Sequence, residues 1–212
     1  MSKIKEISAA VESGKVKLIE GLVQEALDAN EDPTTILNDG MISAMSVVGA
    51  KFQANELFIP EMLIAAKTMK KGVDVLRPHL AGDAVAKNGK YIIGTVAGDL
   101  HDIGKNLVAL MVESNGFEVI DLGVDVSAEK FVETIKANPD CKLIGASALL
   151  TTTMGELKNT VKAIDDAGLK GKVKVMIGGA PVTQKFADDI GADAYAPDAA
   201  SAASKAVELL MS

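Results

Sequence analysis

The second half of the chain alternates between short apolar runs and longer amphipathic stretches. From Lys90 onward the apolar runs are "KYIIGTVA", "FEVIDLG", "CKLIGASA", "KVKVMIGG" and "ADAYA", and a helical pattern follows each of them. Runs of this length between helices predict strands of a parallel sheet that helices cover on both faces. We therefore expect residues 89–212 to form a flavodoxin-like, Rossmann-type α/β domain with a doubly wound, five-stranded parallel sheet.

The first part of the chain has a helical pattern only. Apolar residues recur at helical spacing in "IKEISAAV" and again in "VKLIEGLVQEALDAN". Pro33, which follows an aspartate, and Pro60 each lie near an expected helix start. We expect an all-α four-helix bundle over residues 1–88, with a linker from about residue 77 in "RPHLAGDAVAKNGK".

The charge and the cysteine content limit which binding partners and which cellular compartment suit the protein. The formal net charge is −7, and Lys and Arg are scattered rather than gathered in a stripe, which disfavours nucleic acids and anionic membrane surfaces as partners. The single cysteine, Cys141, excludes an internal disulfide and suits a reducing compartment. No apolar run reaches the roughly 18 residues of a membrane span, and the first residues lack the apolar core of a signal peptide. We expect a cytoplasmic protein that does not enter a membrane.

Polar loops follow three of the expected strands. They are "GDLHDIG" at residues 98–104, "SALLTTT" at residues 147–153 and "GGAP" at residues 178–181. In doubly wound sheets, ligands bind outside the carboxyl ends of the strands, where the strand order reverses. The three loops are therefore expected to converge on one site.

His101, in the first of these loops, supports two interpretations. It is a candidate metal ligand or acid–base group, and Asp99 is placed to hydrogen-bond its other ring nitrogen. Alternatively, His101 is a polar loop residue and Asp102 merely caps the following helix. An isolated histidine does not bind a bare metal tightly, but it can supply one axial bond to a metal that a macrocycle already holds.

The second and third loops are equally open on the residues alone. Thr153 and Glu156 match a T-x-x-E capping box, which explains Thr153 but not four hydroxyls within seven residues. The pair Gly178-Gly179 fits either a tight turn or close approach of a ligand to the backbone. A P-loop and a dinucleotide-binding G-x-G-x-x-G are absent, and one cysteine with two histidines does not suit a zinc site. His79, in the linker, is expected to be solvated.

Taken together, these motifs resemble those of a known family. The pattern Asp99-x-His101-x-x-Gly104, then Ser147-x-Leu149, then the glycine pair, resembles the signature of the cobalamin-binding domain. It is similar to that of cobalamin-dependent methionine synthase and of the small corrinoid proteins of methyltransferase systems. The stretch "MSVVGAKFQANELFIPEMLIAAKTM" resembles the helical cap that precedes this domain. The resemblance covers nearly the whole chain, in the layout of the carriers for methanol, methylamines, betaines and aryl methyl ethers.

The resemblance implies roles for the residues around His101. His101 would be the lower axial ligand of cobalt and would displace the cofactor's own benzimidazole, so that cobalamin binds base-off. Asp99 would accept the proton on the other imidazole nitrogen, and Thr153 would continue this relay. Several relatives have serine at the position of Thr153, and the hydroxyl is kept here.

The remaining contacts implied by the resemblance concern the cofactor's corrin ring and its nucleotide tail. Cofactor contacts in the first loop would come from Asp102, Ile103 and Gly104. The slot for the tail would be formed by Ser147, Leu149, Thr151, Gly178 and Gly179, with Tyr195 and Asp198 at its far end. Phe52 and Ile59 would cover the upper face of the corrin, although their spacing fits an ordinary bundle core equally well.

By this resemblance the chain is a methyl carrier rather than a complete enzyme. The bound cofactor would accept a methyl group as cobalt(I) and donate it from methyl-cobalt(III). The implied partners are a substrate-specific methyltransferase, an acceptor methyltransferase that uses tetrahydrofolate or coenzyme M, and a reductive activase. A cobalamin-dependent sensor is the alternative, although no DNA-binding segment is visible. A mutase subunit, which the cap disfavours, and a flavodoxin-like domain with another ligand are weaker options.

Overall fold

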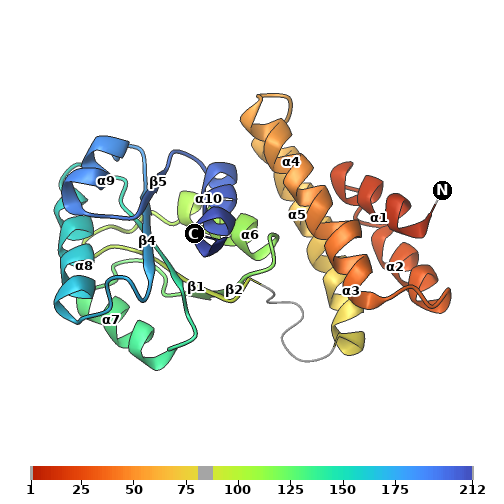
Figure 1. Cartoon of the computed structure of the whole chain (residues 1–212). Helices are drawn as coiled ribbons and strands as arrows, with labels where there is room; N and C mark the ends of the chain where they lie inside the picture. The colour runs from red at the N-terminus through yellow and green to blue at the C-terminus, as the bar shows by residue number, and fades with distance from the viewer. Residues whose placement is uncertain (1, 81–87, 212) are drawn as a thin grey trace. The chain divides into compact units, whose positions relative to one another are not determined.

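The computed structural model describes residues 2–80 and 88–211 of the chain. These residues form two compact units, one made mainly of residues 2–80 and one made mainly of residues 88–211 (Figure 1). The linker expected from about residue 77 falls partly on residues 81–87, which lie outside the described residues. Its described beginning is the 3-10 turn η2 (Arg77–His79), in which His79 is exposed.

The first unit is helical, as predicted. Its elements before η2 are α1 (Lys3–Glu12), α2 (Ile19–Asp28), α3 (Pro33–Thr35), the π-helix η1 (Ile36–Ile42), α4 (Ser43–Gln53) and α5 (Ile59–Leu76). Elements α3, η1 and α4 follow one another without a break, and the middle of this stretch is wound as a π-helix. Asp32 caps α3, because its carboxylate accepts a hydrogen bond from the backbone N–H of Thr35 at 2.8 Å.

The second unit is the predicted parallel sheet with helices on both faces. Its strands are β1 (Lys90–Thr95), β2 (Glu118–Asp121), β3 (Leu143–Ser147), β4 (Lys174–Gly178) and β5 (Ala194–Ala196). All neighbouring strands pair in parallel, in the order β2-β1-β3-β4-β5. The doubly wound, flavodoxin-like class expected from the alternating pattern is therefore confirmed for the described residues.

Five helices cover the sheet. They are α6 (Ile103–Glu113), α7 (Ala128–Ala137), α8 (Met154–Asp166), α9 (Gln184–Ile190) and α10 (Ala199–Met211). Helices α6 and α10 pack together on one face, and α7, α8 and α9 lie on the other (Figure 1). No described helix has both the length and the hydropathy that a membrane crossing requires.

The strand register fixes where the loops of the site begin. Strand β1 lies at the switch point, because its two neighbours, β2 and β3, are reached in opposite directions across the sheet. Thr95 at the end of β1 pairs with Ser147 of β3, which pairs in turn with Gly178 of β4. The three polar loops therefore leave the sheet at the same level of its carboxyl edge, as the sequence predicted.

Candidate functional site

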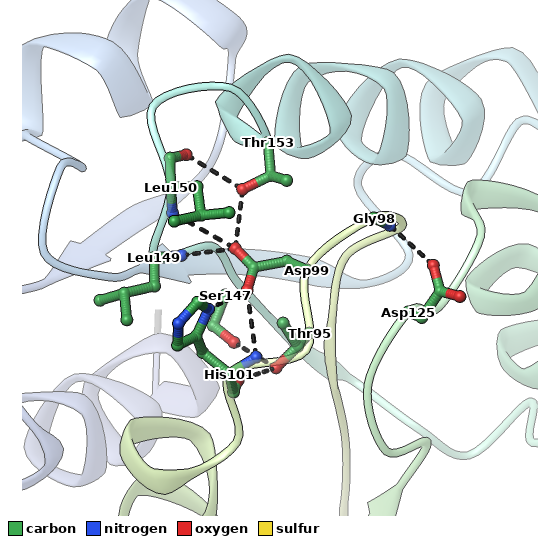
Figure 2. A network of polar contacts seen from close by, with 9 residues as sticks. All are labelled: Thr95, Gly98, Asp99, His101, Asp125, Ser147, Leu149, Leu150 and Thr153. Atoms are coloured by element: carbon green, nitrogen blue, oxygen red, sulfur yellow. Dashed lines mark hydrogen bonds and ion pairs between the residues drawn. The ribbon is translucent and has the colours of Figure 1, made fainter.

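The loop between β1 and α6 brings the imidazole of His101 onto the carboxylate of Asp99 (Figure 2). Nδ1 of His101 lies 2.7 Å from Oδ1 of Asp99, and the His101 backbone N–H donates to the same oxygen at 3.1 Å. The Asp99 side chain is fully buried, whereas the His101 side chain is 50% exposed. Since a carboxylate only accepts hydrogen bonds, the contact selects the imidazole form that carries a proton on Nδ1.

The second oxygen of Asp99 is bound by the loop between β3 and α8. Oδ2 accepts hydrogen bonds from the backbone N–H groups of Leu149 at 2.7 Å and Leu150 at 3.3 Å, and from the hydroxyl of Thr153 at 2.7 Å (Figure 2). Burial alone would raise the pKa of the Asp99 carboxyl, but the hydrogen bonds from Thr153, His101 and Leu149 outweigh burial and hold the pKa well below its usual range. Asp99 is therefore a buried anion that joins two loops.

Thr153 does not act as the helix cap that its capping-box pattern predicts. It occupies the N-cap position of α8, but its side chain makes no capping hydrogen bond. The hydroxyl instead donates to Asp99, and this contact keeps the buried carboxylate satisfied. The helix-cap interpretation of Thr153 is wrong, and the hydroxyl belongs to a continuous chain of contacts from His101 through Asp99.

Two residues that the sequence did not single out hold the backbone of the first loop. Thr95, fully buried at the end of β1, donates its hydroxyl to the carbonyl oxygen of His101 at 2.8 Å and lies 3.0 Å from the hydroxyl of Ser147. Asp125 accepts the backbone N–H of Gly98 on its carboxylate at 2.7 Å. In the sequence, Thr95 is distinguished only as a polar residue inside the apolar run "KYIIGTVA". Asp125 is distinguished only as an aspartate in the loop that follows β2.

A buried lysine also ties this region together. Lys105, in the first turn of α6, is almost completely buried, and its ammonium lies 2.5 Å from the carboxylate of Asp121 at the end of β2. It also donates to the side-chain oxygen of Asn106 at 2.7 Å. The pair links the start of the helix that follows His101 to the neighbouring strand. The apolar pattern of α6 gave no indication that a lysine would be inside.

The other expected residues of the first loop are exposed. Asp102, Ile103 and Gly104 all face solvent, and Ile103 is 78% exposed. The carboxylate of Asp102 accepts a hydrogen bond from the side chain of Asn106 at 3.1 Å. Leu100, beside His101 in sequence, is 71% exposed. Large apolar side chains exposed next to one another are typical of a surface that a ligand or a partner covers.

The predicted tail-slot residues lie at the ends of β3, β4 and β5. The hydroxyl of Ser147 contacts Thr95, Leu149 is partly exposed, Thr151 is exposed and Tyr195 is half-buried. Both predicted glycines are required by the protein itself. A Cβ at Gly178 would lie 2.9 Å from the carbonyl oxygen of Ala196, and one at Gly179, where φ is +130°, would overlap the carbonyl oxygen of Ala148.

Three further predicted cofactor contacts are Asp198, Phe52 and Ile59, and they differ in exposure and in hydrogen bonding. Both carboxylate oxygens of Asp198 are engaged by Ser201, through its backbone N–H at 2.8 Å and its hydroxyl at 2.9 Å. Phe52 in α4 is half-buried, whereas Ile59 at the start of α5 is 45% exposed, so the bundle-core interpretation is wrong for Ile59. The neighbouring Phe58 is 69% exposed and was not singled out from the sequence.

Comparison with known proteins gives matches over both units. A family model described as a B12 binding domain matches residues 89–205, and a second model with the same description matches residues 3–77. A dimethylamine corrinoid protein of Methanosarcina mazei is 43% identical over 209 residues, which cover 98% of this chain and 97% of that protein.

Two solved structures agree with these matches. A cobalamin-binding protein from Desulfitobacterium hafniense superposes with a TM-score of 0.83 and 30% identity, over 97% of this chain and 98% of that one. The methanol:cobalamin methyltransferase complex of Methanosarcina barkeri contains a chain that superposes with a TM-score of 0.86 and 28% identity, over 99% of this chain and 80% of that one.

Proposed function

The chain belongs to the B12-binding family of corrinoid proteins of methyltransferase systems, and from this premise we propose that it is a methyl carrier that serves separate methyltransferases. The corrinoid cofactor expected from the sequence is confirmed by both family matches. We keep the division into a helical cap, residues 1–88, and a cobalamin-binding domain, residues 89–212, as part of this proposal.

The residues present fit a corrinoid bound through His101. Its Nδ1 is held by Asp99, and Nε2 makes no hydrogen bond to the residues that the structure describes, so Nε2 is the nitrogen available to a metal. Leu100 and Ile103 expose apolar surface in the same loop, which suits contact with a large planar ligand. We propose that His101 displaces the cofactor's own base, so that cobalamin binds base-off.

A corrinoid held by His101 would supply a cobalt centre that can accept a methyl group as cobalt(I) and donate it as methyl-cobalt(III). Asp99 keeps the proton of the imidazole on Nδ1, orients the ring and makes Nε2 a stronger donor. Leu149, Leu150 and Thr153 fix the carboxylate in turn through its second oxygen. We propose that His101, Asp99 and Thr153 form a relay that holds or releases the Nδ1 proton as ligation changes.

The rest of the predicted cofactor contacts stay part of the proposal. The first loop contributes Asp102, Ile103 and Gly104, and the upper face of the corrin is assigned to Phe52 and Ile59. The nucleotide tail is assigned to residues at the ends of β3, β4 and β5: Ser147, Leu149, Thr151, Gly178, Gly179, Tyr195 and Asp198. Exposure of Ile59 and Ile103 supports a ligand contact, whereas the engagement of Asp198 by Ser201 leaves that residue the weakest member of the set.

One observation carries the proposal, namely a half-exposed imidazole whose Nδ1 is bound by a fully buried carboxylate at 2.7 Å. The test is the absorption spectrum of the protein reconstituted with aquacobinamide, a corrinoid without the nucleotide base, so that a nitrogen ligand can come only from the protein. The wild-type protein is expected to show a nitrogen-ligated cofactor, and His101→Ala a cofactor without a protein nitrogen ligand. His79→Ala, which removes the other histidine, is the matched control and should leave the spectrum unchanged. Identical spectra of wild type and His101→Ala would refute the assignment.

Partners and substrate are proposed from the names of similar proteins. Since a dimethylamine corrinoid protein is 43% identical over nearly the whole chain, methylated amines are the first class of methyl donor to test. The similar chain in a methanol:cobalamin methyltransferase complex supports a substrate-specific methyltransferase as the direct partner. An acceptor methyltransferase, which uses tetrahydrofolate or coenzyme M, and a reductive activase complete the proposed system. The assay supplies the reduced holoprotein with a candidate methyltransferase and follows methylation of the cofactor by absorbance.

A further inference from the structure

Asp125, in the loop between β2 and α7, makes two hydrogen bonds to the backbone immediately before His101. Its carboxylate accepts the backbone N–H of Gly98 at 2.7 Å (Figure 2). Its own backbone N–H donates to the carbonyl oxygen of Asp99 at 3.0 Å. Strand β1 lies between β2 and β3, so Asp125 holds the segment with Asp99 from the β2 side, whereas Thr153 contacts Asp99 from the β3 side.

These two hydrogen bonds lie near the end of a longer backbone pairing between residues 93–95 and residues 122–126. Leu122 donates to Ile93, Thr95 donates to the carbonyl of Gly123, and Val126 donates to the carbonyl of Thr95. The pairing extends β1 and β2 beyond their last ladder residues, up to the point where Gly98 turns the chain with a φ of +75°. Asp125 thus lies beside the chain at the point where the loop of His101 begins.

The backbone of Asp125 restricts which residues can make this contact. Its φ is +54°, in the left-handed region that asparagine, aspartate and glycine adopt most readily among the amino acids. A residue here must accept the left-handed backbone and must also carry an acceptor two bonds beyond Cβ to reach the N–H of Gly98. Aspartate and asparagine meet both requirements, whereas glycine meets only the first and alanine meets neither.

We propose that Asp125 is a positioning residue for the His101–Asp99 pair, and that it sets how completely His101 ligates the bound corrinoid. The inference rests on the proposed function, because it takes His101 to be the protein ligand. Asp125 itself is exposed and is not placed in contact with the cofactor. Its effect is transmitted through Gly98 and Asp99, whose carboxylate orients the imidazole.

A series of three variants separates the two requirements. Asp125→Asn keeps the acceptor and the left-handed preference, Asp125→Gly keeps only the backbone conformation, and Asp125→Ala loses both. Asn30→Ala is the matched control, since Asn30 is also exposed and left-handed, with a φ of 60°, but lies in the helical unit between α2 and α3. It imposes the same backbone penalty away from the His101 loop.

Two readouts are measured on the full-length protein. In the absence of cofactor, hydrogen exchange of the Gly98 amide is followed by NMR, and urea unfolding reports global stability. With aquacobinamide bound, which lacks the nucleotide base, absorbance gives the ratio of histidine-ligated to unligated cofactor. Loss of the Gly98 hydrogen bond is expected to speed exchange and to lower the ligation ratio by about threefold to tenfold in Asp125→Gly and at least as much in Asp125→Ala. Asp125→Asn is expected to stay within about twofold of wild type, because a neutral acceptor differs little from a charged one at an exposed site.

The outcomes keep this inference apart from the proposed function. If wild type shows no histidine ligation, or His101→Ala does not alter it, the proposed function fails. The Gly98 exchange result then still reports whether Asp125 holds the loop. If wild type is ligated by His101 but Asp125→Gly matches it in both readouts, the positioning role is overturned. It is equally overturned if Asn30→Ala lowers the ligation ratio as much as Asp125→Ala, or if Asp125→Asn loses as much as Asp125→Ala.

Discussion

The imidazole of His101 and the carboxylate of Asp99 are joined at 2.7 Å, although the first side chain is half exposed and the second is fully buried. The buried partner is fixed by the neighbouring loop, and Nε2 of the exposed partner makes no hydrogen bond to any residue that the structure describes. This division lets the protein set the orientation and tautomer of the ring from inside while the ring remains accessible to a metal.

The charge of Asp99 is expected to stabilise the fold itself. Its two oxygens accept hydrogen bonds from both neighbouring loops, and an amide in its place would present a donor to at least one of these N–H or O–H groups. Asp99→Asn is therefore expected to lower the free energy of unfolding of the cofactor-free protein by about 3 kcal/mol. Urea denaturation measures this change. Asp102→Asn, in the same loop but exposed, is the control and should stay within about 0.5 kcal/mol of wild type. Equal effects of the two variants would contradict the role given to Asp99.

The Thr153 hydroxyl, rather than its place at the start of α8, is expected to matter. Thr153→Ser keeps the donor to Asp99 and should cost less than about 1 kcal/mol, whereas Thr153→Val removes one of the three hydrogen bonds that Oδ2 of the buried carboxylate accepts and should cost about 2 kcal/mol. Thermal or urea unfolding of the cofactor-free variants gives both values. A valine variant as stable as the serine variant would show that the hydroxyl contributes nothing to the site.

The pair of Lys105 and Asp121 is expected to respond asymmetrically to substitution. Lys105 is buried, whereas the side chain of Asp121 is 40% exposed. Removal of the Asp121 charge therefore leaves a buried ammonium without its ion-pair partner, whereas removal of the lysine leaves a carboxylate that water can reach. Asp121→Asn, which keeps an acceptor for the N–H of Gly123, should cost about 3 kcal/mol, and Lys105→Met about 1 kcal/mol or less. Urea unfolding at neutral pH distinguishes the two. The reverse order would mean that the lysine is held mainly by its packing and not by the ion pair.

Cys141 is expected to make stability depend on pH on the alkaline side. Burial raises the pKa of its thiol, and the thiol lies 3.3 Å from the carbonyl oxygen of Leu143. In the unfolded chain the thiol ionises near pH 8.5, while the folded protein keeps it protonated to higher pH. The unfolded state is therefore favoured increasingly as pH rises above about 8.5, and wild type should lose stability relative to Cys141→Ala between pH 8 and 10. Unfolding midpoints of both proteins across this range test the sign. A difference that stays constant with pH would exclude the thiol as its source.

Much of this architecture is predictable from the order of residues. Apolar runs such as "KYIIGTVA" predicted the strands because a strand covered on both faces must be apolar along its whole length. The position of His101 at the sheet edge then followed from the geometry of parallel sheets, and its contact with Asp99 followed from their spacing.

The parts that could not be predicted depend on contacts between distant segments. Thr153 matched a local capping motif, yet its hydroxyl turns to a carboxylate 54 positions earlier, because that carboxylate is buried and needs donors. The contact of Asp125 with Gly98 requires a left-handed backbone at Asp125, which the sequence around an aspartate does not reveal. The π-helix η1 between α3 and α4 likewise has no signature in the apolar spacing.

The central claim, that His101 is the protein ligand of the bound cobalt, is tested most directly by electron paramagnetic resonance of the cobalt(II) holoprotein. In unlabelled protein a single axial nitrogen splits each cobalt line into a triplet. With protein labelled with 15N-histidine, our account predicts that the triplet becomes a doublet, and that His101→Ala loses this labelled splitting while His79→Ala retains it. A triplet that persists after labelling would show that the cofactor's own base remains on the metal, and would contradict the account.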